Sequence, residues 1–148
     1  MRRVLLFSAM VMALGGISQA RAADAHLRFV LFNGEKPADV LLIERKHVKE
    51  AARTFSKATY EPQVEISFDE TGRARLHAFT KKHLHKRIAL CVGPFTGTPG
   101  AVIMEPIAAG RIALSQLEDD KAKQLVAAIN GKAAAPLPAS GPCRVFAK

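Results

Sequence analysis

An alternation of apolar and polar positions marks the clearest strand of the chain. Val64, Ile66 and Phe68 alternate with polar residues, which is the period of a strand that buries one face. Short apolar runs predict further strands at residues 27–32, 40–43, 88–92, 101–104 and 112–114. Gly93-Pro94 and the glycine- and proline-rich residues 97–100 predict a break in the chain, with a flexible loop over 93–100.

A helical period appears in three other segments. Apolar residues spaced by three and four predict a helix that starts at residue 46 and ends before Pro62, with an apolar face of Val48, Ala51, Ala52 and Phe55. Asp69 is suited to cap a second helix, in which Leu76 and Phe79 point inward. Acidic residues at 118–120 begin the third helix and Asn130-Gly131 ends it, its apolar face being Ala122, Leu125, Val126 and Ile129.

The order of these elements predicts an α+β fold. We expect a single compact domain with helices packed on one face of a mixed or antiparallel sheet. The domain is predicted at residues 23–137, with an extended C-terminal tail at 138–148. A chain of 148 residues has room for one such domain and for no second one.

Residues 1–22 have the features of a secretory signal peptide. A positively charged start precedes an apolar stretch, and Ala20-Arg21-Ala22 supplies a small-residue cleavage site. The apolar stretch is shorter than the roughly 20 residues that a membrane-spanning helix needs. We therefore expect an exported, most simply periplasmic, protein with no transmembrane span after cleavage.

The chain is basic, with a formal net charge of +9 that falls to +6 when the leader and its three arginines are removed. A basic surface attracts nucleic acid, anionic lipid or acidic protein, or it serves solubility alone. Nucleic acid is not expected as a partner, because the protein is exported and offers one Tyr and no Trp for base stacking.

The two cysteines, Cys91 and Cys143, leave two alternatives open. An oxidising compartment allows them to pair, which would join the C-terminal tail to the core. In the other alternative Cys91 is a buried free thiol and Cys143 is exposed, because spacing alone does not report the geometry that a disulfide needs.

No pattern in the sequence predicts catalysis, a metal or a cofactor. We find no nucleophile elbow, no Ser/His/Asp or Cys/His arrangement and no pair of carboxylates with a catalytic pattern. His83 and His85 form a His-x-His pair, but neighbouring lysines and arginines repel a dication. The pair also supplies only two of the three or four ligands that a metal site usually has. We expect a protein that is not an enzyme and that binds neither metal nor cofactor.

The candidate binding residues are basic and aromatic. Lys81, Lys82, Lys86 and Arg87 form the densest charged cluster, which suits an anionic surface or an acidic polypeptide, or is an ordinary solvated helix end. Phe95 is the large apolar residue of the predicted loop, where it would be either a recognition anchor or a residue packed back onto the sheet.

Several short motifs occur in an order that resembles the head subdomain of the first periplasmic domain of SecD and SecDF. They are VEISFDETG at 64–72, FT at 79–80, KRIAL at 86–90, EPIAAG at 105–110 and the final helix, followed by Gly131 and a Pro-Leu pair at 136–137. Residues 41–43 and 46–48 are similar to the strand and helix that precede the head. The resemblance covers most of residues 27–137.

SecD and SecDF are membrane subunits of the bacterial Sec export machinery, so the resemblance implies a binding module for unfolded exported polypeptide or for a Sec or envelope protein. The alternative is an envelope adaptor, or a module that binds anions or a membrane surface, in which the fold is reused without a role in export. Gly93-Pro94 departs from the Asp-Gly turn of the family. The transmembrane acidic residues through which SecD and SecDF use the proton gradient are not expected in the mature chain.

Overall fold

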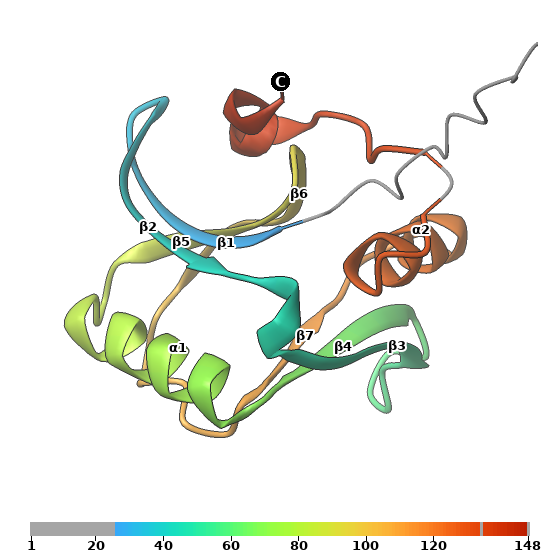
Figure 1. Ribbon diagram of the computed structural model, residues 1–148, viewed down its shortest axis with the longest axis horizontal. Helices are drawn as coiled ribbons and strands as arrows, with labels where there is room; N and C mark the ends of the chain where they lie inside the picture. The colour runs from blue at the N-terminus through green and yellow to red at the C-terminus, as the bar shows by residue number, and fades with distance from the viewer. Residues whose placement is uncertain (1–25, 134, 148) are drawn as a thin grey trace, which may run out of the picture.

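Two antiparallel sheets organise the residues that the computed structural model describes, 26–133 and 135–147 (Figure 1). The predicted leader, 1–22, lies outside them. The four-stranded sheet has the order β2-β1-β5-β6 and the three-stranded sheet has the order β3-β4-β7. The elements along the chain are β1 (Leu27–Asn33), β2 (Lys36–Ile43), η1 (Arg45–His47), β3 (Val48–Phe55), β4 (Pro62–Phe68), α1 (Glu70–Lys82), β5 (Arg87–Val92), β6 (Phe95–Val102), β7 (Arg111–Leu114), α2 (Asp119–Ile129) and η2 (Gly141–Phe146). The α+β class predicted from the sequence is confirmed.

The inner faces of the two sheets share one core with the two α-helices. On β4, Val64, Ile66 and Phe68 are buried and alternate with partly exposed residues, which confirms the strand predicted from the sequence pattern. The Phe68 ring meets Phe29 of β1 edge to face, with ring centroids 6.4 Å apart. Helix α1 packs against β2 and β4, whereas α2 packs against β3, β4 and β5.

Helix α1 begins as the sequence indicates, and a buried side chain anchors its other end. The Asp69 carboxylate accepts a hydrogen bond of 2.7 Å from the Gly72 N–H, which is the predicted cap. Near the other end, the buried Thr80 hydroxyl donates to the Leu76 carbonyl (2.8 Å) and accepts from the Ile107 N–H (2.9 Å). Thr80 therefore connects α1 to the segment between β6 and β7.

The helix predicted from residue 46 is wrong, because residues 48–55 form β3 after one turn of 3₁₀ helix. Strand β3 pairs with β4 along its length, with an irregularity between Val48 and Glu50. Ala51 is buried against the core, but Phe55 at the far end of the apparent helical face is about half exposed. The apolar spacing that fitted a helix therefore arose from a strand with an interrupted register.

The flexible loop predicted over residues 93–100 is also wrong. Only Gly93-Pro94 form a turn, in which Gly93 has a φ of 56°, and β6 then pairs with β5 from Phe95 onward. Gly97 lies close to β7, since a Cβ there would make a tight contact of 3.2 Å with the Leu114 side chain. The pairing has two irregularities, which accommodate a segment rich in glycine and proline at the sheet edge.

The C-terminal part of the chain folds back over the four-stranded sheet. Helix α2 covers Asp119–Ile129, and Gly131, whose φ is 65°, follows its cap residue Asn130, so the predicted third helix and its stop are confirmed. Within the following residues, η2 packs against β5 and β6. Figure 1 shows η2 above the outer face of the four-stranded sheet, beside the start of β6.

Truncating the shared core is expected to destabilise the whole domain. We expect Ile66→Ala to lower the free energy of unfolding by about 2–5 kcal/mol, because it opens a cavity at a fully buried site. Urea denaturation followed by circular dichroism measures the change. Met104→Ala is the control, since Met104 is 71% exposed and its truncation should change the value by less than about 0.5 kcal/mol. Equal stability of the two variants would contradict the core described above.

Candidate functional site

Strand β2 is an edge strand with apolar side chains facing solvent. It pairs with β1 on one side, and the described residues place no strand on its other side. Leu41 and Ile43 are buried in the core, while Val40 and Leu42 on the opposite face are 39% and 36% exposed. An edge strand offers unpaired backbone groups to another chain, and here two aliphatic side chains lie beside them.

The edge of β2 is the more open of the two edges of this sheet. The hydrogen bond from its Val40 N–H is local, because the acceptor at 2.9 Å is the carboxylate of the adjacent Asp39. At the other edge, the Thr96 N–H of β6 donates to the Ser140 hydroxyl at 2.9 Å, and the Ser140 N–H donates to the Pro94 carbonyl at 3.1 Å. The C-terminal segment therefore covers the start of β6.

One edge of the three-stranded sheet is also engaged in part. The Ala51 carbonyl of β3 accepts a hydrogen bond of 3.0 Å from the side-chain amide of Asn130, at the end of α2. At the opposite edge, β7 is four residues long. Strand β7 is half as long as the eight-residue β2, and β3, which is also eight residues long, has its Ala51 carbonyl already engaged by Asn130.

The basic cluster predicted from the sequence lies next to β2. Lys81 and Lys82 end α1, and Lys86 and Arg87 follow the turn that leads into β5; all four are exposed. Asp39 of β2 links the cluster to the strand, because it binds the Lys82 ammonium at 3.1 Å and the His83 ring at 2.8 Å. The structure therefore places the charged cluster beside Asp39 of the edge strand, whereas Val40 and Leu42 lie on the opposite face of that strand.

The electrostatics of this contact hold Asp39 in its ionised form. Hydrogen bonds from Lys82 and, second, from His83 lower the pKa of the Asp39 carboxyl below its usual value. The ionised carboxylate keeps the C-terminal end of α1 beside β2. It neutralises part of the cluster, and the more remote Lys81 and Lys86 remain as exposed cations.

Phe95 is not an exposed recognition anchor. Its side chain is 8% exposed and belongs to the main core, with the Lys121 ammonium 5.4 Å from the ring centroid. The expected free loop does not exist there, because Phe95 pairs with Val92 directly after the turn. Of the two alternatives for Phe95, the structure shows packing onto the sheet.

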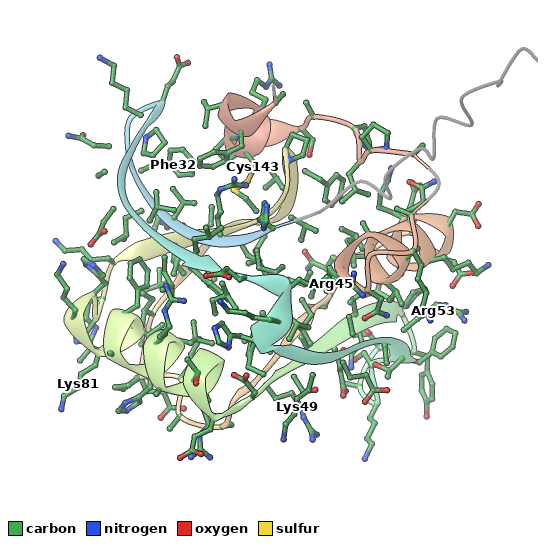
Figure 2. The ribbon with its side chains drawn as sticks, in the orientation of Figure 1. Phe32, Arg45, Lys49, Arg53, Lys81 and Cys143 are labelled. Carbon is green, nitrogen blue, oxygen red and sulfur yellow. A yellow bond between two sulfur atoms is a disulfide. The ribbon has the colours of Figure 1, made fainter. Side chains whose placement is uncertain are left out.

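Cys91 and Cys143 are joined by a disulfide, with their Cα atoms 5.5 Å apart. Both residues are fully buried, and Val30, Phe32 and Phe146 pack around them. Figure 2 shows Cys143 and Phe32 close together on the side of the sheet that η2 covers. The disulfide therefore attaches η2 to the outer face of β5, and a free thiol at Cys91 is not observed.

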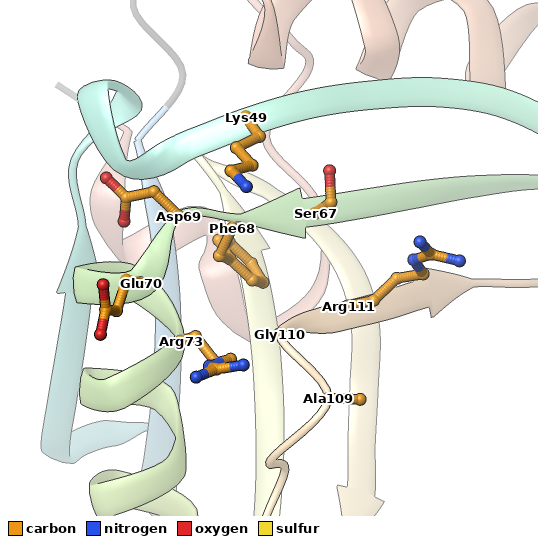
Figure 3. A pocket seen from close by; sticks show the side chains of 9 residues that line it. All are labelled: Lys49, Ser67, Phe68, Asp69, Glu70, Arg73, Ala109, Gly110 and Arg111. Carbon is orange, nitrogen blue, oxygen red and sulfur yellow. The ribbon is translucent and has the colours of Figure 1, made fainter.

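A shallow depression of about 580 Å³ lies at the start of α1 (Figure 3). Lys49, Arg73 and Arg111 reach it from β3, α1 and β7, and Asp69 and Glu70 line the same space. The depression thus combines both signs of charge. Asp69 is committed to structure, since it caps α1 and binds the His47 ring at 3.0 Å.

The described residues contain no cluster typical of a metal site. No group of three or more His, Cys, Asp or Glu side chains converges among them. His83 is held by Asp39, and His85 lies in the turn after α1, where its φ is 62°. Ser67 donates a hydrogen bond to the Glu50 carbonyl.

Val40 and Leu42 are functional candidates that were not predicted from the sequence. The apolar run at 40–43 predicts a strand, but it does not indicate where that strand lies in the sheet. Polar residues on either side of the run, Asp39 and Glu44, are compatible with an edge position, which is the one signal that the sequence carries.

Comparison with protein families and solved structures identifies relatives of the domain. The sequence profile of the SecDF P1 head subdomain matches residues 32–136. A structure of SecDF, reported as a membrane component that enhances protein export, superposes with a TM-score of 0.62 and 18% identity and covers 76% of this chain; this chain covers 64% of that one. A second, SecDF in a super-membrane-facing form, gives a TM-score of 0.58 and 19% identity, covering 74% of this chain and 19% of that one.

At 18% and 19% identity, the similarity to these two structures shows that this chain shares their fold and nothing more. This chain spans less than two thirds of the first SecDF structure and about a fifth of the second. Comparison with curated protein sequences finds no match. Within the described part of the chain, no helix is long and apolar enough to cross a membrane.

The cap at Asp69 predicts a loss of stability in acid. The hydrogen bond from Gly72 and, second, that from His47 lower the pKa of the Asp69 carboxyl in the folded state. Its contribution is therefore present above the unfolded pKa of about 3.9 and disappears as the pH falls through the lower folded pKa. Asp69→Asn, which caps without titrating, should show a smaller acid-induced fall in melting temperature between neutral and strongly acidic pH. Asp120→Asn, at a 90% exposed side chain, should keep the wild-type pH profile; an unchanged profile for Asp69→Asn would contradict the role of the cap.

The disulfide is expected to contribute substantially to stability. Replacing both cysteines with alanine should lower the free energy of unfolding by about 2–5 kcal/mol, because the crosslink closes a separation of 52 residues. Urea denaturation with and without a reducing agent measures this. Reduction should lower the wild-type midpoint and leave the double variant unchanged, whereas a wild-type midpoint that is insensitive to reductant would contradict the assignment.

Proposed function

We propose that this chain, which belongs to the SecDF P1 head subdomain family, is a non-enzymatic exported module that binds extended polypeptide by adding it as a strand to the β2 edge. The observation that carries the proposal is the open edge of β2 with the exposed side chains of Val40 and Leu42. Strand addition uses main-chain hydrogen bonds for affinity and alternate side chains for selectivity.

This mode of binding suits unfolded proteins of varied sequence. Main-chain hydrogen bonds are available from any extended segment, so the partner needs no fixed motif. An aliphatic side chain of the added strand would pack beside Val40 or Leu42 on the outer face of the sheet. The neighbouring Lys81 and Lys86 would attract acidic segments from solution.

The membership of the family supports a place in protein export. SecDF is a membrane component that enhances protein export, and a separate head domain would contact exported polypeptides or Sec and envelope proteins. The proposed location is the periplasm, to which the predicted leader at residues 1–22 would direct the protein. The functional domain is proposed as residues 23–137, and no cofactor is required.

A second candidate function is favoured by the exposed cations at one end of the molecule. Lys81, Lys82, Lys86 and Arg87 would let an envelope adaptor bind anions or an anionic membrane surface, at about 1 kcal/mol per charge near anionic lipid. Sedimentation with phosphatidylglycerol vesicles tests this alternative. Charge reversal at Lys81 and Lys86 should abolish binding to vesicles, whereas Lys57→Glu, at an exposed lysine in the turn after β3, should not.

The decisive test uses a fluorescently labelled secretory protein kept unfolded by reduction and alkylation. Val40→Lys is expected to weaken its binding at least about tenfold, or about 1.4 kcal/mol, because it replaces an aliphatic side chain that the bound polypeptide would cover with a charge at the pairing edge. Val102→Lys is the matched control, since Val102 is 41% exposed on β6. Equal weakening by both variants, or by neither, would refute binding at β2.

A further inference from the structure

A groove runs between the β1–β2 hairpin and η2, across the outer face of the four-stranded sheet. It consists of two hollows of about 380 and 510 Å³ that meet at Gly34 and Pro142. Phe32, Arg87 and Ala89 line the first hollow, and Arg144 and Val145 line the second. We call this pair of hollows the η2 groove.

The floor of the η2 groove is apolar and lies on a rigid sheet. Ala89 lies on the same face of β5 as Cys91, and its partner on the neighbouring strand β1 is Val30. Phe32 is partly buried on the next position of that face of β1. Gly34 and Gly100 add no side chain, and a Cβ built on either would meet no atom within 4 Å, so the space above them is open.

The wall formed by η2 is fixed in place by covalent and polar contacts. The disulfide joins Cys143 to the sheet, and the Thr96 hydroxyl donates to the Ser140 carbonyl at 2.6 Å. The Arg28 guanidinium lies 4.6 Å from the ring centroid of Phe146. A preformed wall of this kind lowers the entropy cost of binding.

The charge of the η2 groove is complementary to an acidic ligand. Arg87 lines one hollow and Arg144 the other, while Glu35 is the one carboxylate among the lining residues. Arg87 uses one N–H to bind the Gly100 carbonyl at 3.3 Å, and Arg144 uses one to bind the Gly141 carbonyl at 3.1 Å. Each guanidinium has five N–H donors, so others remain for a carboxylate.

We propose that the η2 groove binds an extended polypeptide segment in which an apolar side chain is flanked by acidic residues. The apolar side chain would rest on Phe32 and Ala89, and the carboxylates would bind Arg87 and Arg144. The residues of the η2 wall follow residue 136, where the family match ends, so this surface is built partly from sequence outside the matched head subdomain. The inference rests on the proposed function only in that both sites bind polypeptide.

The test uses a fluorescently labelled synthetic peptide that alternates leucine and glutamate, with the anisotropy read against protein concentration. Arg144→Glu is expected to weaken binding at least about fivefold, and added salt should weaken binding to the wild type. Lys57→Glu makes the same type of charge reversal at an exposed lysine in the turn after β3, and it should leave the affinity unchanged. Peptides that alternate leucine with lysine, or serine with glutamate, should bind weakly, because each lacks one of the two recognised features.

Two further variants separate the η2 groove from the β2 edge. The peptide also has the extended backbone that the β2 edge is proposed to bind, so its binding is measured in the Val40→Lys background, where adding Arg144→Glu should still weaken it at least about fivefold. Arg144→Glu alone should leave binding of the unfolded secretory protein at β2 largely intact. Replacing both cysteines with alanine should release the η2 wall and abolish peptide binding. Wild-type affinity in the Arg144→Glu variant, or equal binding of the leucine–lysine peptide, would overturn the proposal; the Arg144 result is decisive even if the cysteine variant does not fold.

Discussion

The packing of two sheets against each other is the contact on which the other features of this domain depend. A sheet with one apolar face is stable only when that face is covered, and here Phe29 of one sheet meets Phe68 of the other. The same core receives Leu76 of α1 and Leu125 of α2, so both helices are positioned by it. Once the inner faces are buried against each other, binding is left to the edges and to the outer faces.

The edges of the sheets differ in how far their backbone groups are engaged. Ser140 binds the start of β6, and Asn130 binds the Ala51 carbonyl of β3, whereas the Val40 N–H of β2 bonds only with the neighbouring Asp39 side chain. An unpaired edge is a liability for self-association unless it is covered or charged. The cations beside β2 would discourage pairing between copies of the chain while leaving the edge accessible to another polypeptide.

The outer face of the four-stranded sheet is divided by the disulfide. The bond between Cys91 and Cys143 places η2 over Val30, and the part of the face that η2 does not cover contains the η2 groove and the exposed residues of β2. The division depends on contacts between residues that are far apart in the chain. A proposed binding surface is therefore created partly by η2, a segment that is held in place by contacts with β5 and β6.

The sequence by itself determined the elements whose signals are local. The alternation in β4, the cap at Asp69 and the acidic start and glycine stop of α2 each depend on neighbouring residues, and all three were predicted. Tertiary structure decided the state of residues 48–55 and 95–102, because their apolar spacing and glycine content are overridden when β3 pairs with β4 and β6 with β5. It also decided that Phe95 is buried, that the cysteines meet and that β2 is an open edge. Strand order and long-range pairing are set by the global burial of apolar faces, which no local pattern records.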